Sequence, residues 1–234
     1  MAHLTLKDHS DHDLLSDPNQ VQAHNYWTVL QGEFPWCLDD SDETDAPSDL
    51  IGLFDLLFAD PPRSKKSLEK SSSAALERAK PDTQWVCYAE LFLKDQGSLL
   101  LLSPLESIGG YLNAFSEAGL QHQATYIWYN SSIQTHEAVL WASKEEPKFK
   151  PCLPEFLNFL SSESTNIDQK ASLIELLVRT FSEEEMTVLE PFASDNQLLT
   201  ACQKLHRHCL SIVRKRTHLR QIVNSMMLPL KQTA

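Results

Sequence analysis

The sequence lacks three features that would argue against an ordinary globular protein. No stretch of its 234 residues approaches the roughly 20 consecutive apolar residues that cross a bilayer. Residues 1–10 have neither the basic nor the apolar part of a secretory signal. The five cysteines are scattered and never spaced as CxxC, so neither a disulfide framework nor a zinc site is indicated. We therefore expect a soluble, cytoplasmic protein with no membrane insertion, no metal, and reduced thiols that are mostly buried.

The composition predicts one compact domain with a short appendage. Hydrophobic residues make up 42% of the chain and charged residues 22%, which is typical of a single α/β domain. Residues 1–20 are rich in Asp, His and Ser with little periodicity, so we expect a flexible arm there and one domain over 21–234. His3, His9 and His12 could be drawn as a metal site, and the alternative is a polar tail.

Charge is distributed unevenly along the sequence. The formal net charge is −12, yet residues 1–50 hold eleven acidic residues and one lysine, whereas residues 196–234 hold seven basic residues and no acid. The acidic total makes DNA an unlikely partner. A local basic patch remains at Arg214, Lys215, Arg216 and Arg220, and the alternative interpretation is a solvated helix face.

Short apolar runs alternate with amphipathic segments. The run at 51–59, ended by Pro61 and Pro62, is typical of a strand buried on both faces. We expect strands at 21–34, 51–59, 98–103, 125–129, 137–142, 186–189 and 209–213, and helices at 85–94, 109–118, 155–160, 167–181, 197–205 and 217–227. This pattern predicts an α/β fold with a mostly parallel sheet, an antiparallel hairpin, and helices on both faces.

The order of these elements resembles the β-class amino-methyltransferases, which modify adenine N6 or cytosine N4 in DNA. The strand ending in Asp60, Pro61 and Pro62 matches the family's catalytic Asp-Pro-Pro-Tyr motif until Arg63 replaces the aromatic residue. Further segments of the sequence resemble family motifs at Leu93–Leu99, Ile127–Trp128, Thr135–Leu140, Leu173–Val178 and Val188–Ala193.

The resemblance covers about residues 50–213 and implies a Rossmann-like methyltransferase fold. It implies a catalytic half at about 21–145, a short linker at about 146–168, and a cofactor half at about 169–234. The family inserts a target-recognition domain before its cofactor half, and the segment 144–170 is too short to hold one.

The chain departs from the family in the loop that would bind S-adenosylmethionine. The family has glycines there, which let the backbone approach the cofactor, whereas this chain has Phe192, Ser194, Asp195 and Asn196. Asn196 could adopt a left-handed conformation, but Asp195 would repel the cofactor's carboxylate. Val213 stands where a family acid accepts hydrogen bonds from the ribose. We therefore expect a degenerate site and no bound cofactor.

The catalytic motif is only partly preserved. In the family, its Asp and first Pro accept hydrogen bonds from the target amino group, and the aromatic residue stacks on the flipped base. Asp60 and Pro61 remain, and Arg63 could stack its guanidinium on a base. The alternative is that Asp60, Pro61 and Pro62 are kept only as a strand end and a turn.

Two further groups of residues each have a functional and a structural interpretation. The five tryptophans, Trp27, Trp36, Trp85, Trp128 and Trp141, could form a stacking platform or belong to the core. The run His206, Arg207, His208, with Cys202 and Cys209 beside it, could suggest a metal cluster or a solvated loop.

Three functional hypotheses follow. The first is a catalytically inactive methyltransferase-like protein that binds other proteins as a subunit of a larger assembly, for which a bacterial secretion coupling complex is a guess. The second is a divergent S-adenosylmethionine-dependent DNA adenine methyltransferase that relies on a partner for DNA recognition. The third is a decoy that binds DNA without modifying it, which the net charge disfavours.

Overall fold

The computed structural model describes residues 21–24, 26–32, 34, 50–62, 82–130, 134–151, 153–157 and 169–227. Several sequence-based expectations lie outside these residues: the arm at 1–20, Arg63, Trp36, Cys37 and Cys152. No helix in the described ranges is both long and apolar enough to cross a membrane.

One nine-stranded sheet runs through the described chain, in the order β1-β2-β9-β8-β3-β4-β6-β5-β7. Its strands are β1 (Val21–His24), β2 (Trp27–Gln31), β3 (Phe54–Ala59), β4 (Leu93–Pro104), β5 (Gln121–Asn130), β6 (Thr135–Ser143), β7 (Phe156–Leu157), β8 (Thr187–Glu190) and β9 (His208–Val213). Strands β2, β9, β8, β3 and β4 run parallel to one another, and β4, β6 and β5 pair antiparallel. The expected mostly parallel sheet with an antiparallel hairpin is confirmed.

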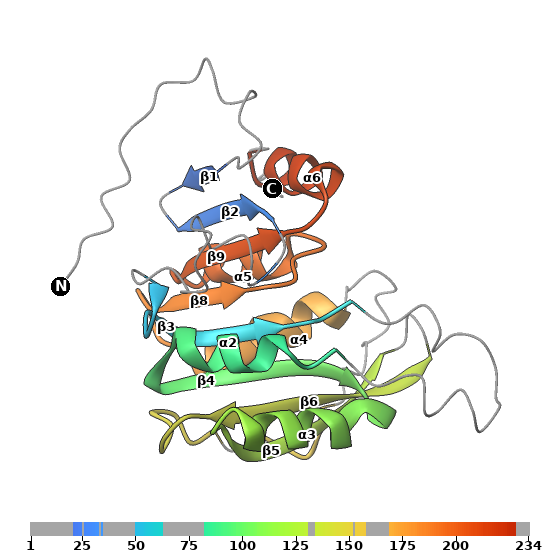
Figure 1. The fold of residues 1–234 in the computed structure, drawn as a ribbon. Coiled ribbons are helices and arrows are strands. Elements are labelled where there is room, and N and C mark those ends of the chain that lie inside the picture. Colours follow the sequence, from blue (N-terminus) through green and yellow to red (C-terminus); the bar gives the residue numbers. More distant parts are fainter. Residues whose placement is uncertain are drawn as a thin grey trace.

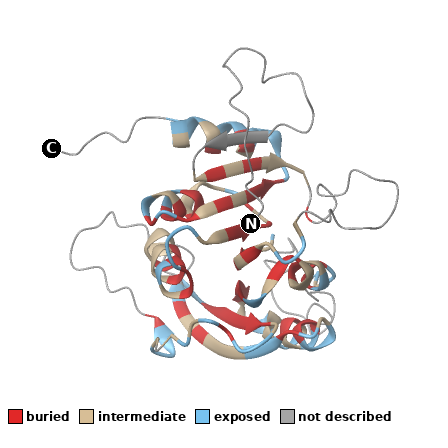
Figure 2. Cartoon of the chain, turned by 90° about the vertical axis from the view of Figure 1, so that its left-hand side faces the viewer, coloured by how far each residue is buried: buried red, intermediate tan, exposed pale blue. Residues whose placement is uncertain are grey.

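Helices cover both faces of this sheet (Figure 1). They are α2 (Trp85–Phe92), α3 (Ile108–Glu117), α4 (Gln169–Phe181), α5 (Gln197–Lys204) and α6 (Arg216–Met227). Helices α2 and α3 contribute to one core cluster, and α4, α5 and α6 contribute to the other. Buried residues of the two clusters therefore line both sides of the central strands. Figure 2 shows that these strands are largely buried along their length.

Strand β4 illustrates why a continuous apolar run forms a central strand. Its side chains alternate, so that Leu100 and Leu102 enter one core cluster while Leu99 and Leu101 enter the other. All four leucines are buried. Full burial of one leucine side chain contributes about 1.5–3 kcal/mol. The absence of polar alternation in the sequence thus follows from helices on both faces.

The described tryptophans belong to the core. The side chains of Trp27, Trp85, Trp128 and Trp141 are all buried, which supports the structural interpretation over a stacking platform. Of the described cysteines, Cys202 and Cys209 are buried as expected, whereas Cys87 is exposed.

Three expectations about the elements are corrected. The single strand expected at 21–34 is a hairpin, because β1 folds back on β2. Residues Phe156–Leu157, expected within a short helix, form β7 instead. Ile127 N on β5 donates a hydrogen bond to Glu155 O at 2.7 Å, so the open edge of β5 imposes the extended conformation. Finally, β4 begins at Leu93 rather than at Ser98.

Gly97 lies where β4 bulges against β3, since the register shifts between Phe54 and Leu56. A Cβ atom on Gly97 would meet Lys94 O at 2.9 Å and Phe54 O at 3.0 Å. We predict that Gly97→Ala lowers the free energy of unfolding by about 1–3 kcal/mol in urea denaturation. Gly109→Ala is the control, because no atom lies within 4 Å of its added Cβ in α3. Equal stability of the two variants would contradict the prediction.

Candidate functional site

The candidate site lies where the chain reverses direction across the sheet. From β3 the chain continues to β4 on one side, and from β8 it continues to β9 on the other. Because β3 and β8 are parallel neighbours, their carboxyl ends meet at one edge. Open α/β sheets bind their ligands in the crevice outside such a switch point. Asp60 follows β3 here, and Glu190 ends β8.

Lys170, in the first turn of α4, holds two carboxylates in this crevice. Its Nζ atom lies 2.8 Å from Asp60 Oδ2 and 3.7 Å from Asp195 Oδ2. The side chains of Lys170 and Asp60 are only 27% and 25% exposed, so solvent screens this pair less than a surface pair. Burial acts to lower the pKa of Lys170, but Asp60, Asp195 and Glu190 outweigh it and the pKa is raised. Lys170 therefore remains charged at neutral pH.

Glu190 is a buried acid beside this pair. Burial raises its pKa to about 8, although a hydrogen bond from Ser211 Oγ to Glu190 Oε2 acts in the opposite direction. The nearby charges of Asp195 and Asp60 raise the pKa further, whereas that of Lys170 lowers it. The crevice thus contains one ammonium group, two carboxylates and one carboxyl group that is mostly protonated at neutral pH.

In the loop after β8, the carboxylate of Asp195 contacts the start of α5. Asp195 Oδ1 accepts a hydrogen bond from Gln197 N, the first amide of α5, at 3.0 Å. This amide is one of the unpaired donors with which a helix N-terminus binds anions. Asn196 has φ of −104°, so the left-handed conformation that the sequence left open for it is not adopted. Ser194 is exposed.

Two of the expected cofactor-binding residues pack into the protein core. Val213, at the end of β9, is fully buried with the cluster that includes Leu219 and Ile222 of α6. Phe192 makes an edge-to-face contact with Trp85 at a ring separation of 5.1 Å and another with Phe34 at 6.0 Å. The side chains of Phe192 and Val213 are therefore structural.

The preserved part of the catalytic motif borders the crevice. Asp60 is half-buried, Pro61 is half-buried, and Pro62 is exposed. On the α3 side, burial raises the pKa of Tyr111 to about 12, with further contributions from Asp82 and Asp60. Asp60 is thus the described member of the motif with a functional group in the crevice, and Lys170 already binds it.

Three features of the described residues bear on whether S-adenosylmethionine could bind at this edge of the sheet. The first amide of α5, Gln197 N, already donates a hydrogen bond to the carboxylate of Asp195. The residue expected to meet the ribose, Val213, is fully buried, its side chain has no hydrogen-bond acceptor, and its carbonyl oxygen already accepts a hydrogen bond from Gly32 N. Asp60 is neutralised by Lys170. These features concern the regions where the family resemblance would place the carboxylate of the cofactor, its ribose, and the catalytic motif.

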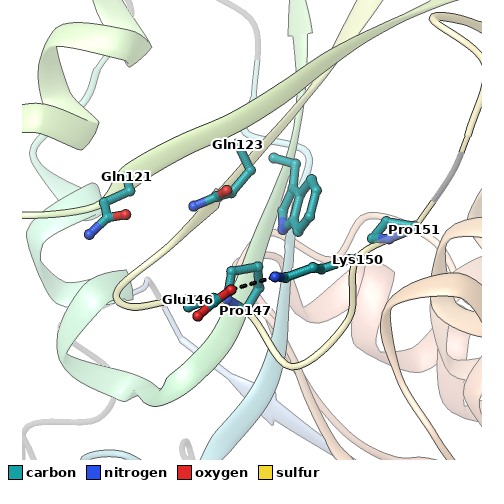
Figure 3. Close-up of a pocket in the computed structure, with 7 residues that line it drawn as sticks. Gln121, Gln123, Glu146, Pro147, Lys150 and Pro151 are labelled. Atoms are coloured by element: carbon teal, nitrogen blue, oxygen red, sulfur yellow. Dashed lines mark hydrogen bonds and ion pairs between the residues drawn. The ribbon is translucent and has the colours of Figure 1, made fainter.

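A hollow away from these residues lies against β5 and β6 (Figure 3). It measures about 520 Å³ and is lined by Gln121 and Gln123 of β5, Trp141 of β6, and the segment from Glu146 to Pro151. Glu146 and Lys150 form an exposed ion pair across it. The hollow is distant from the crevice, because Gln121 pairs with Ser143 and Ser143 with Ser98, near the amino end of β3.

The loop before β9 differs from the expected solvated loop. His206 is exposed, but Arg207 is buried and donates hydrogen bonds from Nε to Ser182 Oγ at 3.1 Å and from Nη2 to Ser182 O at 2.6 Å. Burial lowers the pKa of this guanidinium. Arg207 therefore joins the loop that follows α5 to the end of α4.

Sequence reasoning identified Asp60 and Asp195 but missed Lys170 and Glu190. Glu190 could have been identified in the same way as Asp60, because each is an acidic residue at the end of a buried apolar run. Lys170 has no such signal, since a lysine in the first turn of an amphipathic helix is usually solvated.

Comparison with known proteins supports the fold. No protein-family model matches the sequence, and no curated protein matches it either. Solved structures do match. The PvuII cytosine-N4-specific DNA methyltransferase has a TM-score of 0.63 at 16% identity, covering 85% of this chain and 85% of its own. M1.HpyAVI has a TM-score of 0.54 at 18% identity, covering 74% and 86%.

A third similar structure is TTHA0409, a putative DNA modification methylase from Thermus thermophilus, solved in complex with S-adenosyl-L-methionine. It has a TM-score of 0.57 at 17% identity and covers 76% of this chain and 88% of its own. The expected fold class is therefore confirmed: the chain has the Rossmann-like α/β fold of DNA N4 and N6 methyltransferases.

Glu190 gives a prediction for the pH dependence of stability. Its carboxyl group ionises above about pH 8 in the folded chain but near its usual value when unfolded, so stability falls as pH rises between these values. The slope from this one group is at most about 1.4 kcal/mol per pH unit. We predict that Glu190→Gln makes the free energy of unfolding, measured in urea between pH 5 and 8, less dependent on pH.

Glu175→Gln is the control with the opposite sign. A hydrogen bond from Lys204 lowers the pKa of Glu175, so its contribution is present at neutral pH and is lost as pH falls through the acid range. An unchanged pH profile in Glu190→Gln would show that Glu190 ionises normally in the folded protein.

Proposed function

We propose that this methyltransferase-like protein does not transfer methyl groups and acts as a protein-binding subunit of a larger assembly. The observation that carries this proposal is the ionic network in the crevice. Lys170 pairs with Asp60, and Asp195 binds the first amide of α5. The charges and donors that a cofactor would need are engaged by the chain's own side chains.

The energetic cost of admitting a cofactor supports the proposal. A ligand carboxylate at α5 would have to displace Asp195 from Gln197 N and would then lie near the displaced carboxylate. Breaking a half-buried pair such as Lys170–Asp60 also leaves charges without partners, and such a loss costs several kcal/mol when both groups are desolvated. No contact from Val213 offsets these costs.

The molecular surface offers a better basis for a function than the crevice does. Four basic residues, Arg214, Lys215, Arg216 and Arg220, are exposed where β9 leads into α6, and we call them the basic surface. The acidic residues are concentrated at the other end of the sequence. Separated charges of opposite sign steer association and select complementary protein partners.

The first test measures cofactor binding by the full-length protein. We expect no saturable heat with S-adenosylmethionine below about 1 mM in titration calorimetry, because Asp195 and Lys170 engage the groups that would bind it. Thermal melting of the same sample confirms that the protein is folded. We expect Asp195→Ser to bind S-adenosylmethionine at least as well as the wild type does. Asp95→Asn makes the same change of charge on an exposed residue and should leave cofactor binding as it is in the wild type.

Micromolar binding by the wild type would overturn the proposal and favour a divergent DNA adenine methyltransferase. The observation that favours this second function is Asp60, which directly follows β3 in the crevice as the family resemblance requires. Transfer of a tritiated methyl group to DNA, abolished by Asp60→Ala, would establish that activity. Label at background level in both proteins agrees with the proposed silent subunit.

The second test addresses the proposed assembly. An affinity-tagged full-length chain, recovered from its native host, should retain one set of proteins in constant proportion, identified by mass spectrometry. Asp60→Ala should retain the same set, since partner binding does not require the crevice chemistry. Recovery of the chain alone, or loss of the partners with Asp60→Ala, would contradict the proposed role.

A further inference from the structure

Strand β5 is only partly covered on one of its two sides. On the first side, β5 pairs with β6 from Gln121 to Asn130. On the second side, β7 pairs only with Ile127 and Trp128. Among the described residues, no strand flanks this second side between Gln121 and Tyr126, and we call this stretch the open edge. An uncovered strand edge is a template on which another chain can pair.

The hydrogen bond to β7 shows which backbone groups face the open edge. Ile127 N donates to Glu155 O at 2.7 Å, so this amide points away from β6. In an antiparallel pair, successive residues of a strand turn their N–H and C=O groups to opposite sides. Thr125, two residues before Ile127, therefore presents both groups to the open edge. The irregular pairing with β6 lies before Thr125, between His122 and Ala124.

The segment that leads into β7 does not supply the missing pairing. Pro147, Pro151 and Pro154 have no backbone N–H and cannot donate a hydrogen bond to a neighbouring strand. The first described backbone hydrogen bond between this segment and β5 is the one to Glu155. The strand position that β7 fills is therefore not continued beside Thr125.

The hollow of Figure 3 adjoins the open edge on the face of the sheet that α4 covers. Its volume of about 520 Å³ is typical of ligand pockets, which measure roughly 300–1,000 Å³. Trp141 and Pro147 are buried and give the hollow apolar walls. Gln121 pairs with Ser143, two residues from Trp141, so its side chain lies on the same face as Trp141. Alternate side chains of a strand paired on the open edge would point to this face too.

Gln123 supplies an oriented polar group to the hollow. His122 and Ala124 pair with adjacent residues of β6, so Gln123 is the extra residue of a β-bulge, a feature that redirects side chains. Gln123 Nε2 donates to Ser143 Oγ at 2.9 Å, which leaves Oε1 as the acceptor of this amide. Ser143 Oγ in turn donates to Glu145 O at 2.7 Å and fixes the arrangement.

We propose that the open edge of β5 and the hollow together bind an extended peptide segment of a partner protein. The peptide backbone pairs with Thr125, and one large apolar side chain enters the hollow against Trp141. An uncharged occupant fits, because Glu146 and Lys150, the two charged residues that line the hollow, pair with each other. A nucleic acid would need an excess of cations, which this lining lacks.

This inference goes beyond the proposed function by naming a surface and a kind of partner. It is also independent of the crevice, because Gln121 lies at the other end of the sheet from Asp60. Failure of the peptide test therefore leaves the cofactor test unaffected, and a chain that transfers methyl groups could still bind the peptide.

Selection from a phage-displayed library of random peptides on the immobilised full-length protein tests the proposal. The library is first depleted on Gln121→Trp, whose added ring fills the hollow. The most enriched peptide is then labelled with fluorescein and titrated in fluorescence anisotropy. We expect saturable binding to the wild type and at least about tenfold weaker binding to Gln121→Trp, a loss of about 1.4 kcal/mol. Thermal melting confirms that both proteins are folded.

The matched control is His122→Trp, which adds the same ring to the neighbouring exposed residue. His122 pairs with Ala142, so it lies on the opposite face of β5 and this variant should bind the peptide as the wild type does. Hydrogen exchange followed by NMR reports on the edge. The bound peptide should slow exchange of the Thr125 amide at least about tenfold, whereas the Tyr126 amide, which faces β6, should change little.

Three results would overturn the proposal. The first is that no peptide remains after depletion on Gln121→Trp. The second is an equal loss of binding in His122→Trp, because binding would then not depend on the hollow. The third is a bound peptide that leaves exchange at Thr125 unchanged, because the occupant would then not pair with the open edge.

Discussion

The ion pair between Lys170 and Asp60 is the interaction on which the crevice depends. Three acids from different elements converge there: Asp60 after β3, Glu190 at the end of β8, and Asp195 before α5. A cation offsets the repulsion between neighbouring like charges. Lys170 Nζ lies 2.8 Å from Asp60 Oδ2 and 3.7 Å from Asp195 Oδ2, and burial raises the pKa of Glu190 to about 8. The same lysine connects α4 to β3, so the charge balance also holds a helix against the sheet.

Different residues determine the fold of this protein and the ligands that such a fold can bind. The sheet brings the ends of β3 and β8 together through backbone pairing and apolar burial, whatever side chains follow these strands. The residues that decide ligand binding lie in the connecting segments. Here the segment after β8 supplies Asp195 to α5, and Val213, the last residue of β9, packs into the core. A fold shared with DNA methyltransferases is therefore compatible with a crevice that is engaged internally.

The sequence predicts the features that depend on local residue patterns. It does not predict the contacts between residues that are far apart in the chain. The buried strands were recognisable because helices on both faces leave them continuously apolar, as at Leu99–Leu102. Asp60 was recognisable because it ends such a strand. Lys170 was not, since its partner is 110 residues away and nothing local marks it. Phe156 and Leu157 were assigned to a helix because only the edge of β5 makes them a strand.

Charge is distributed differently at the crevice and at α6. At the crevice, Lys170 pairs with Asp60, and Asp195 accepts a hydrogen bond from Gln197 N, so these groups are engaged within the chain. On α6, the basic residues are exposed and the helix end adds to their charge. The field that an approaching anion meets at this edge of the sheet thus originates from α6.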